Sequence, residues 1–128
     1  MVRKITREAR EHGNAAGLTP SELAAVLRLE QDGPATASGL ARSESMRPQS
    51  MAAVVKALGT RGFIRGRSDP GDGRQILFAL TDTARRWLKE GRAARQDWLS
   101  HVIAERLSPE EQEHLMSAIG LLKRLADD

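Results

Sequence analysis

The chain has 128 residues and a formal net charge of +3, with 40% apolar residues, 29% charged residues and no cysteine. This length fits one domain, and the lack of cysteine excludes disulfides, cysteine-ligated zinc and thiol-based redox sensing and fits a reducing cytoplasm. No apolar run is long enough to cross a bilayer, and two Phe, two Trp and no Tyr argue against aromatic platforms for single-stranded bases, so a nucleic acid partner would be duplex.

The first two predicted elements are helices. Residues 1–11 are expected to form a short helix, which the stretch 13–17 with its two glycines interrupts. The sequence Thr19-Pro20-Ser21-Glu22 predicts the second start, because Thr19 is a capping residue, Pro20 fits a first turn and Glu22 completes a capping box. This second helix is expected to run to Asp32 and to bury Leu23, Val26 and Leu27.

Two closely spaced helices follow. Thr36 caps a helix that ends near Arg42, and three residues connect it to a helix that opens at Arg47-Pro48 and runs to about Arg61. Apolar residues three and four apart give the second of these an inward face: Met51, Val54, Val55 and Leu58. Such a short connection is typical of a helix-turn-helix.

The opposite face of the second helix suits duplex DNA. Gln49 and Ser50 follow Pro48 in the first turn and are placed to reach base edges, while small Ala53 would let the backbone approach the bases. Its basic residues are expected on phosphates, or else are ordinary solvated surface: Arg47, Lys56 and Arg61.

A hairpin is predicted next. Residues 67–74 are dense in turn formers, and residues 75–80 alternate, with Ile76, Phe78 and Leu80 on one face of a half-buried strand. We expect two strands with a basic tip that offers Arg65, Arg67 and Arg74. Arg74 has two open roles: it could enter a minor groove, or it could pair with Asp69 or Asp72 and brace the loop.

Two long helices complete the chain. Thr81 or Asp82 starts a helix to about Arg106, on which an apolar stripe recurs every three or four residues and includes Trp87 and Trp98. A rod of this length exceeds the width of a small domain, so part of its stripe is expected to need a partner chain. Ser108 opens the last helix with another capping box, followed by Leu115, Ile119, Leu122 and Leu125.

Charge is unevenly distributed. Residues 42–74 hold seven basic and three acidic side chains, whereas residues 107–128 hold two basic and five acidic ones. The excess of positive charge therefore coincides with the predicted helix-turn-helix and hairpin, as a phosphate-binding surface requires.

No constellation predicts an enzyme, a metal site or a cofactor. His12, His101 and His114 lack metal-ligand spacing, and no nucleophile is accompanied by a base and an orienting group. A calcium loop starting at Asp69 would need a bidentate Glu at its twelfth position, where Leu80 stands.

The segments 58–64 and 69–81 together resemble the multiple antibiotic resistance regulator (MarR) family of winged helix-turn-helix regulators. The family pattern is Asp-x-Arg, five residues, Leu-Thr, and Asp72, Arg74, Leu80 and Thr81 match it. The resemblance extends over about Leu18 to Leu125 and implies an α+β, mostly α, winged helix-turn-helix fold with terminal dimerisation helices.

The resemblance also implies an organisation and a function. Residues 1–18 would be a short or truncated N-terminal dimerisation segment, residues 19–81 the DNA-binding lobe, and residues 82–128 the C-terminal dimerisation helices of a single domain. A homodimer would repress transcription from a pseudo-palindromic operator until an effector releases it. A small aromatic or phenolic effector would bind in a crevice bordered by His12, Arg86 and Trp87, although core packing or a dimer contact competes for Trp87.

One alternative from a different class remains open at this point. Winged helices also serve as protein-binding modules, and the basic face could meet an acidic protein partner without reading a DNA sequence. A steep salt dependence of binding to random duplex DNA would favour the DNA-binding interpretation.

Overall fold

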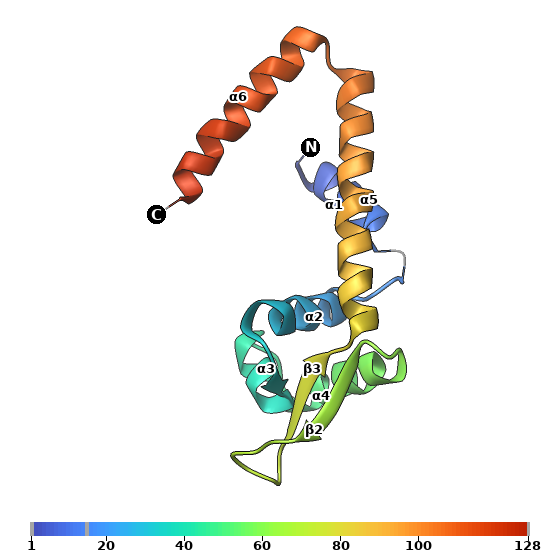
Figure 1. Cartoon of the computed structure of the whole chain (residues 1–128), viewed down its shortest axis with the longest axis vertical. Helices are drawn as coiled ribbons and strands as arrows, with labels where there is room; N and C mark the ends of the chain where they lie inside the picture. The colour runs from blue at the N-terminus through green and yellow to red at the C-terminus, as the bar shows by residue number, and fades with distance from the viewer. Residues whose placement is uncertain (1, 15, 128) are drawn as a thin grey trace. The chain divides into compact units, whose positions relative to one another are not determined.

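The computed structural model describes residues 2–14 and 16–127 and contains six helices and three strands among them (Figure 1). The elements are α1 (Val2–His12), α2 (Pro20–Asp32), β1 (Ala35–Thr36), α3 (Ala37–Ser43), α4 (Pro48–Thr60), β2 (Ile64–Ser68), β3 (Ile76–Leu80), α5 (Asp82–Arg106) and α6 (Pro109–Ala126). They form two compact units, one within residues 14–91 and the other made from residues 1–13 and 92–128. The winged helix-turn-helix lies in the first unit.

Helix α2 begins as its sequence predicts. The Thr19 hydroxyl accepts the Glu22 backbone N–H at 3.2 Å, and Glu22 Oε1 accepts the Thr19 N–H at 2.9 Å. The predicted inner face is wrong at Leu27, which is 40% exposed. The buried stripe runs through Glu22, Ala25, Val26 and Leu29, so the helix is rotated and Leu27, about 100° beyond Val26, faces outward.

The inner face of α4 is as expected. Met51 and Leu58 are fully buried, Val55 is 7% exposed, and all three belong to one core with residues of α2, α3 and the sheet. The helix ends at Thr60, and Gly62, two residues further on, has a left-handed φ of 78°. Its N–H donates to Gly59 O and the Phe63 N–H donates to Leu58 O, which is the Schellman pattern that turns the chain into β2.

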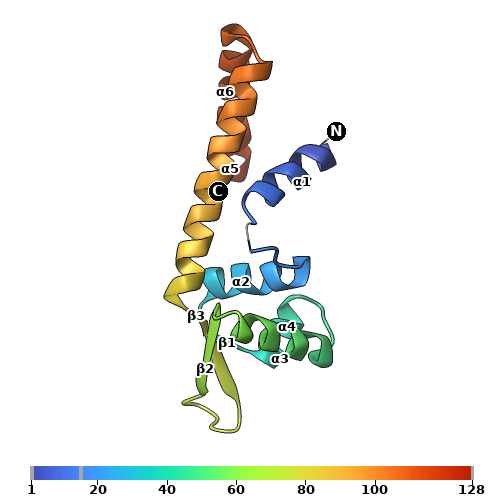
Figure 2. The same cartoon turned by 90° about the vertical axis from the view of Figure 1, so that its right-hand side faces the viewer.

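The sheet has three strands in the order β1-β3-β2, all antiparallel (Figure 2). The sequence predicted only the β2–β3 pair, because the two residues of β1 carry no alternation. They pair with β3 at Phe78 and Leu77 and fix the start of α3 beside the hairpin. Leu80 is buried and Phe78 half-buried, but Ile76, near the hairpin tip, is 53% exposed because it lies beyond the core.

A side chain larger than hydrogen would be crowded at one position of the hairpin. Gly66 lies opposite Phe78, and a Cβ there would come within 2.7 Å of Ile76 Cγ2 and 3.1 Å of Phe78 Cε1. The side chains of β3 therefore lie across β2 at Gly66, which gives this face of the hairpin its packing.

Candidate nucleic-acid interface

The turn between α3 and α4 sets where α4 begins. The Glu44 N–H donates to Leu40 O, and the Met46 N–H donates to Ala41 O at 2.8 Å. Between them Ser45 has a φ of 53°, a left-handed conformation that few residues other than glycine adopt. This compact turn produces the helix-turn-helix that the spacing predicted.

The outer face of α4 is open to solvent. Pro48, Gln49, Ser50, Ala53 and Lys56 are all exposed, whereas Met51 between them is buried. The first turn therefore presents an amide, a hydroxyl and small side chains on a backbone whose first N–H groups have no intrahelical acceptor. This is the arrangement with which a helix meets base edges in a major groove.

Several basic side chains around this face have no acidic partner among the described residues. Arg47 occupies the N-cap of α4 but makes no side-chain capping bond. Among the described residues, Arg47, Lys56, Arg65 and Arg67 form no ion pair. Their charges are free to meet an external anion.

Arg61 has an internal partner. Its Nη1 donates to Ala16 O at 2.7 Å, which ties the end of α4 to the segment before α2. Its charge also acts on buried Glu22, whose pKa lies below the ordinary value first because the Thr19 backbone N–H binds the carboxylate, and further because of the Thr19 hydroxyl and Arg61. The expectation of Arg61 on a phosphate thus competes with a structural role.

The wing arginines lie in two different places. Arg65 and Arg67 belong to strand β2, not to the hairpin tip as expected, because β2 runs to Ser68. They line an open pocket of about 460 Å³ together with residues 79–83 at the start of α5. Only Arg74 stands on the tip, where its side chain is 95% exposed.

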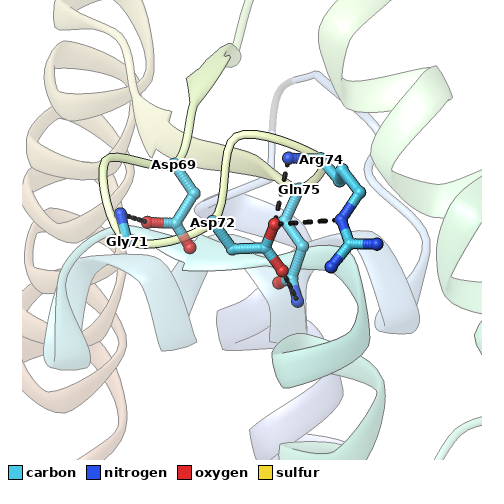
Figure 3. Close-up of polar contacts among 5 residues, drawn as sticks. All are labelled: Asp69, Gly71, Asp72, Arg74 and Gln75. Atoms are coloured by element: carbon cyan, nitrogen blue, oxygen red, sulfur yellow. Dashed lines mark hydrogen bonds and ion pairs between the residues drawn. The ribbon is translucent and has the colours of Figure 1, made fainter.

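The tip is shaped by its two aspartates (Figure 3). Asp69 Oδ1 accepts the Gly71 N–H at 3.0 Å, and Asp72 Oδ1 accepts the Arg74 N–H at 3.1 Å. Asp72 Oδ2 also accepts from the Gln75 side chain at 3.4 Å, and its Oδ1 lies 3.6 Å from Arg74 Nε. The Asp72 carboxylate thus contacts both the backbone N–H and the guanidinium of Arg74, while most of the Arg74 side chain stays in solvent.

The residues expected to border an effector crevice fall in different units. In the unit of residues 14–91, Trp87 packs on Phe63 with ring centroids 5.4 Å apart, and Arg86 is exposed. The Trp87 indole N–H is buried and has no acceptor among the described residues. In the other unit, His12 stacks on Trp98 at 5.0 Å and its Nδ1 donates to Glu8 O.

The contact between Arg28 and Glu44 could not be predicted from any local pattern in the sequence. Arg28 of α2 donates from Nε to Glu44 Oε1 at 3.1 Å, across 16 residues of sequence. The hydrogen bond and charge of Glu44 raise the pKa of Arg28 above its ordinary value. Arg28 and Glu44 were not expected at the site, because neither lies on a face that the periodicity of α4 or the wing singles out.

Three comparisons describe what the chain is similar to. A family model described as the MarR family matches residues 18–76. An HTH-type transcriptional regulator of Mycobacterium bovis is 33% identical over 127 residues, which cover 99% of this chain and 88% of that protein. A Pseudomonas aeruginosa protein described as a transcriptional regulator has 31% identity and a TM-score of 0.80, with 99% of this chain and 89% of that chain covered.

A further likeness concerns the fold alone. A Staphylococcus aureus MepR mutant, solved bound to an oligodeoxyribonucleotide, superimposes with a TM-score of 0.76 at 15% identity, over 98% of this chain and 92% of that one. Separately, none of the described helices combines the length and apolar character that crossing a membrane needs.

Proposed function

Because this chain belongs to the MarR family of helix-turn-helix transcriptional regulators, which are DNA-binding proteins and not enzymes, we propose that it is an effector-responsive repressor that binds a pseudo-palindromic operator as a homodimer. The observation that carries the proposal is the exposed outer face of α4, where Gln49 and Ser50 lie beside Arg47 and Lys56, which form no ion pair among the described residues. The MepR mutant of the same fold, which was solved bound to an oligodeoxyribonucleotide, supports DNA as the partner.

The residues divide by what they would recognise. Gln49 and Ser50 read base edges in the major groove, and Ala53 permits their close approach. Arg47 and Lys56 bind phosphates and contribute affinity without sequence information. Arg74 enters the adjacent minor groove from the wing, with its backbone held by Asp72.

Selection of bound sequences from a random duplex pool tests the proposal directly. A repressor of this kind enriches two inverted half-sites whose centres lie about 10 base pairs, or a multiple of that, apart. Enrichment of a single asymmetric site would contradict the dimeric operator. The absence of any enriched sequence, with a flat salt dependence of binding, would favour the protein-interaction module instead.

Substitution at Gln49 distinguishes base reading from phosphate binding. We expect Gln49→Ala to lose about 1 to 3 kcal/mol on the selected duplex and to relax the preference at one position of each half-site. The matched variant Lys56→Gln should weaken binding to all duplexes alike and reduce the salt slope by about 1. Uniform weakening by Gln49→Ala would assign it to the phosphates.

Helix α6 supports the homodimer. Met116, Leu121, Leu122 and Leu125 are between 59% and 84% exposed in the single chain, so an apolar surface remains uncovered. A second copy that packs its own terminal helices against this surface would remove it from water.

Trp87 supports an effector site. A buried indole N–H without an acceptor leaves a hydrogen bond unmade, which an oxygen atom of a small aromatic ligand could complete. Phenol and benzoate are suitable probes, added to a Trp98→Phe variant in which Trp87 is the remaining indole. A saturable change of Trp87 fluorescence, accompanied by release of the selected duplex, is expected. An unchanged emission together with unchanged DNA affinity would count against these aromatic effectors at Trp87.

A further inference from the structure

Helix α4 differs from its neighbours in how it begins. Helices α2, α3, α5 and α6 each start with a hydroxyl that accepts a backbone N–H of the first turn, supplied by Thr19, Thr36, Thr81 and Ser108. The N-cap of α4 is Arg47, which makes no such bond, and the first turn of α4 contains no acidic residue. The start of α4 therefore lacks the local side-chain anchor that α2, α3, α5 and α6 have.

The turn before α4 supplies an anchor from elsewhere. Glu44 ends α3, three residues before Arg47, and its carboxylate receives the Arg28 guanidinium at 3.1 Å. The two side chains are 34% and 20% exposed, so the pair is partly shielded from water. Arg28 Nη1 also lies 3.5 Å from Asp32 Oδ2, one helical turn further along α2. Arg28 thus joins α2 to the turn.

Apolar packing acts on a different part of α4. The buried residues Met51, Val55 and Leu58 begin at the fourth residue of α4 and fix the helix against the core from there on, and half-buried Met46 of the preceding turn packs against the same core. The residues proposed to read bases, Gln49 and Ser50, precede all three. Their position therefore depends also on the four-residue turn of residues 44–47, which Met46 holds by apolar packing and the Arg28–Glu44 pair by a polar contact with α2.

We propose that Arg28 and Glu44 are positioning residues of the DNA interface, whose ion pair holds the first turn of α4 in place for base contact. The inference rests on the proposed function, since it assumes that this turn reads DNA. A binding constellation loses affinity when its supporting contacts leave it loose by about 1 Å. Leaving the helix start without its own cap keeps the first N–H groups available to DNA, and the ion pair replaces the missing local anchor.

The first test compares affinities of Arg28→Gln, Glu44→Gln and the double variant for the duplex selected by the native protein and for a scrambled duplex. Each single variant is expected to lose about tenfold on the selected duplex and little on the scrambled one, and the double variant should lose no more than either single one. The salt slope should stay unchanged, because no phosphate contact is removed. Asp32→Asn is the matched control: it removes the other carboxylate near Arg28, keeps the pair with Glu44, and should bind as the native protein does.

The second test needs no DNA. Amide hydrogen exchange in the free protein should become about fivefold faster at residues 51–52, the first amides of α4 with an intrahelical acceptor, in the Arg28→Gln and Glu44→Gln variants, while the amides of residues 54–58 exchange as before. Unchanged exchange at residues 51–52 together with native affinity overturns the proposal. An equal loss on both duplexes with a smaller salt slope also overturns it, because Arg28 would then be a phosphate contact. If the native protein selects no duplex, the proposed function fails, whereas the exchange measurement still decides whether the pair holds α4.

Discussion

Thr81 joins the wing to the start of α5, and its hydroxyl can be removed without changing the side-chain shape. The Thr81 O–H donates to Gly62 O at 2.6 Å and its oxygen accepts the Ala84 N–H at 3.2 Å. Thr81→Val deletes both bonds while the backbone bond from the Thr81 N–H to Phe63 O remains. The Leu-Thr of the family pattern thus has a physical role here: its threonine closes the hairpin and caps the helix.

The expected cost follows from those two bonds. An N-terminal cap contributes about 0.5 to 2 kcal/mol and a hydrogen bond about 0.5 to 1.5 kcal/mol to the free energy of unfolding. Gly62 is exposed, so water replaces part of what its carbonyl loses, and we expect a total of about 1 to 2 kcal/mol. With a urea m-value of about 2 kcal/mol/M, the unfolding midpoint should fall by about 0.5 to 1 M.

The assay is urea unfolding followed by circular dichroism at one fixed protein concentration, since dimerisation would make the midpoint depend on concentration. Thr83→Val is the matched control, because Thr83 is exposed two residues away and makes no hydrogen bond within the described chain. Thr81→Ser, which retains the hydroxyl, should recover most of the loss. Equal midpoints for Thr81→Val and Thr83→Val would refute the reasoning.

Three further predictions concern glycine, acid and assembly. Gly66→Ala should lower the free energy of unfolding by about 1 to 3 kcal/mol, because the added Cβ would lie 2.7 Å from Ile76 Cγ2. Gly59→Ala should raise it by about 0.5 to 1 kcal/mol, because a Cβ at this position of α4 meets no atom within 4 Å. Thermal unfolding of the two variants checks both predictions. Since the pKa of Glu22 is lowered on folding, its stabilising contribution is present above the ordinary pKa of 4.5 and is lost as pH falls through the folded value. Glu22→Gln should therefore show a weaker loss of stability below pH 4.5 in acid titrations, and an unchanged pH dependence would contradict this. Leu122→Asp, at a 62% exposed position, should produce monomers in sedimentation while Ser117→Asp on the same helix does not; equal sedimentation of the two would remove α6 from the interface.

Local signals predicted most of the fold. The capping boxes at Thr19 and Ser108, the inward stripe of α4 and the turn formers after Ser68 each act within a few residues, and the corresponding elements are present. Strand β1 escaped prediction because two residues cannot show a period, and Leu27 was misplaced because several helical faces of α2 are apolar enough to pass as the core.

In the candidate site, too, local features could be predicted from the sequence and long-range contacts could not. The exposure of Gln49, Ser50 and Lys56 follows from the burial of Met51 and Val55 on the other side of the helix, so the period alone predicts it. The contacts of Arg61 with Ala16 and of Arg28 with Glu44 span 45 and 16 residues, and a charged residue in the sequence does not state which distant group it will meet. Such long-range polar contacts are therefore visible only in the folded structure.

The hairpin tip has a consequence for how such regulators can diversify. Its shape comes from Asp69 and Asp72, whose side chains bind groups only two or three residues further along, so the loop is folded by its own sequence. Residues 69–75 can therefore be replaced as a unit in the hairpin without changes to the core residues beneath them. Gly71 and Gly73 of this loop are both exposed, so substitutions there change the surface of the tip and leave the core residues as they are.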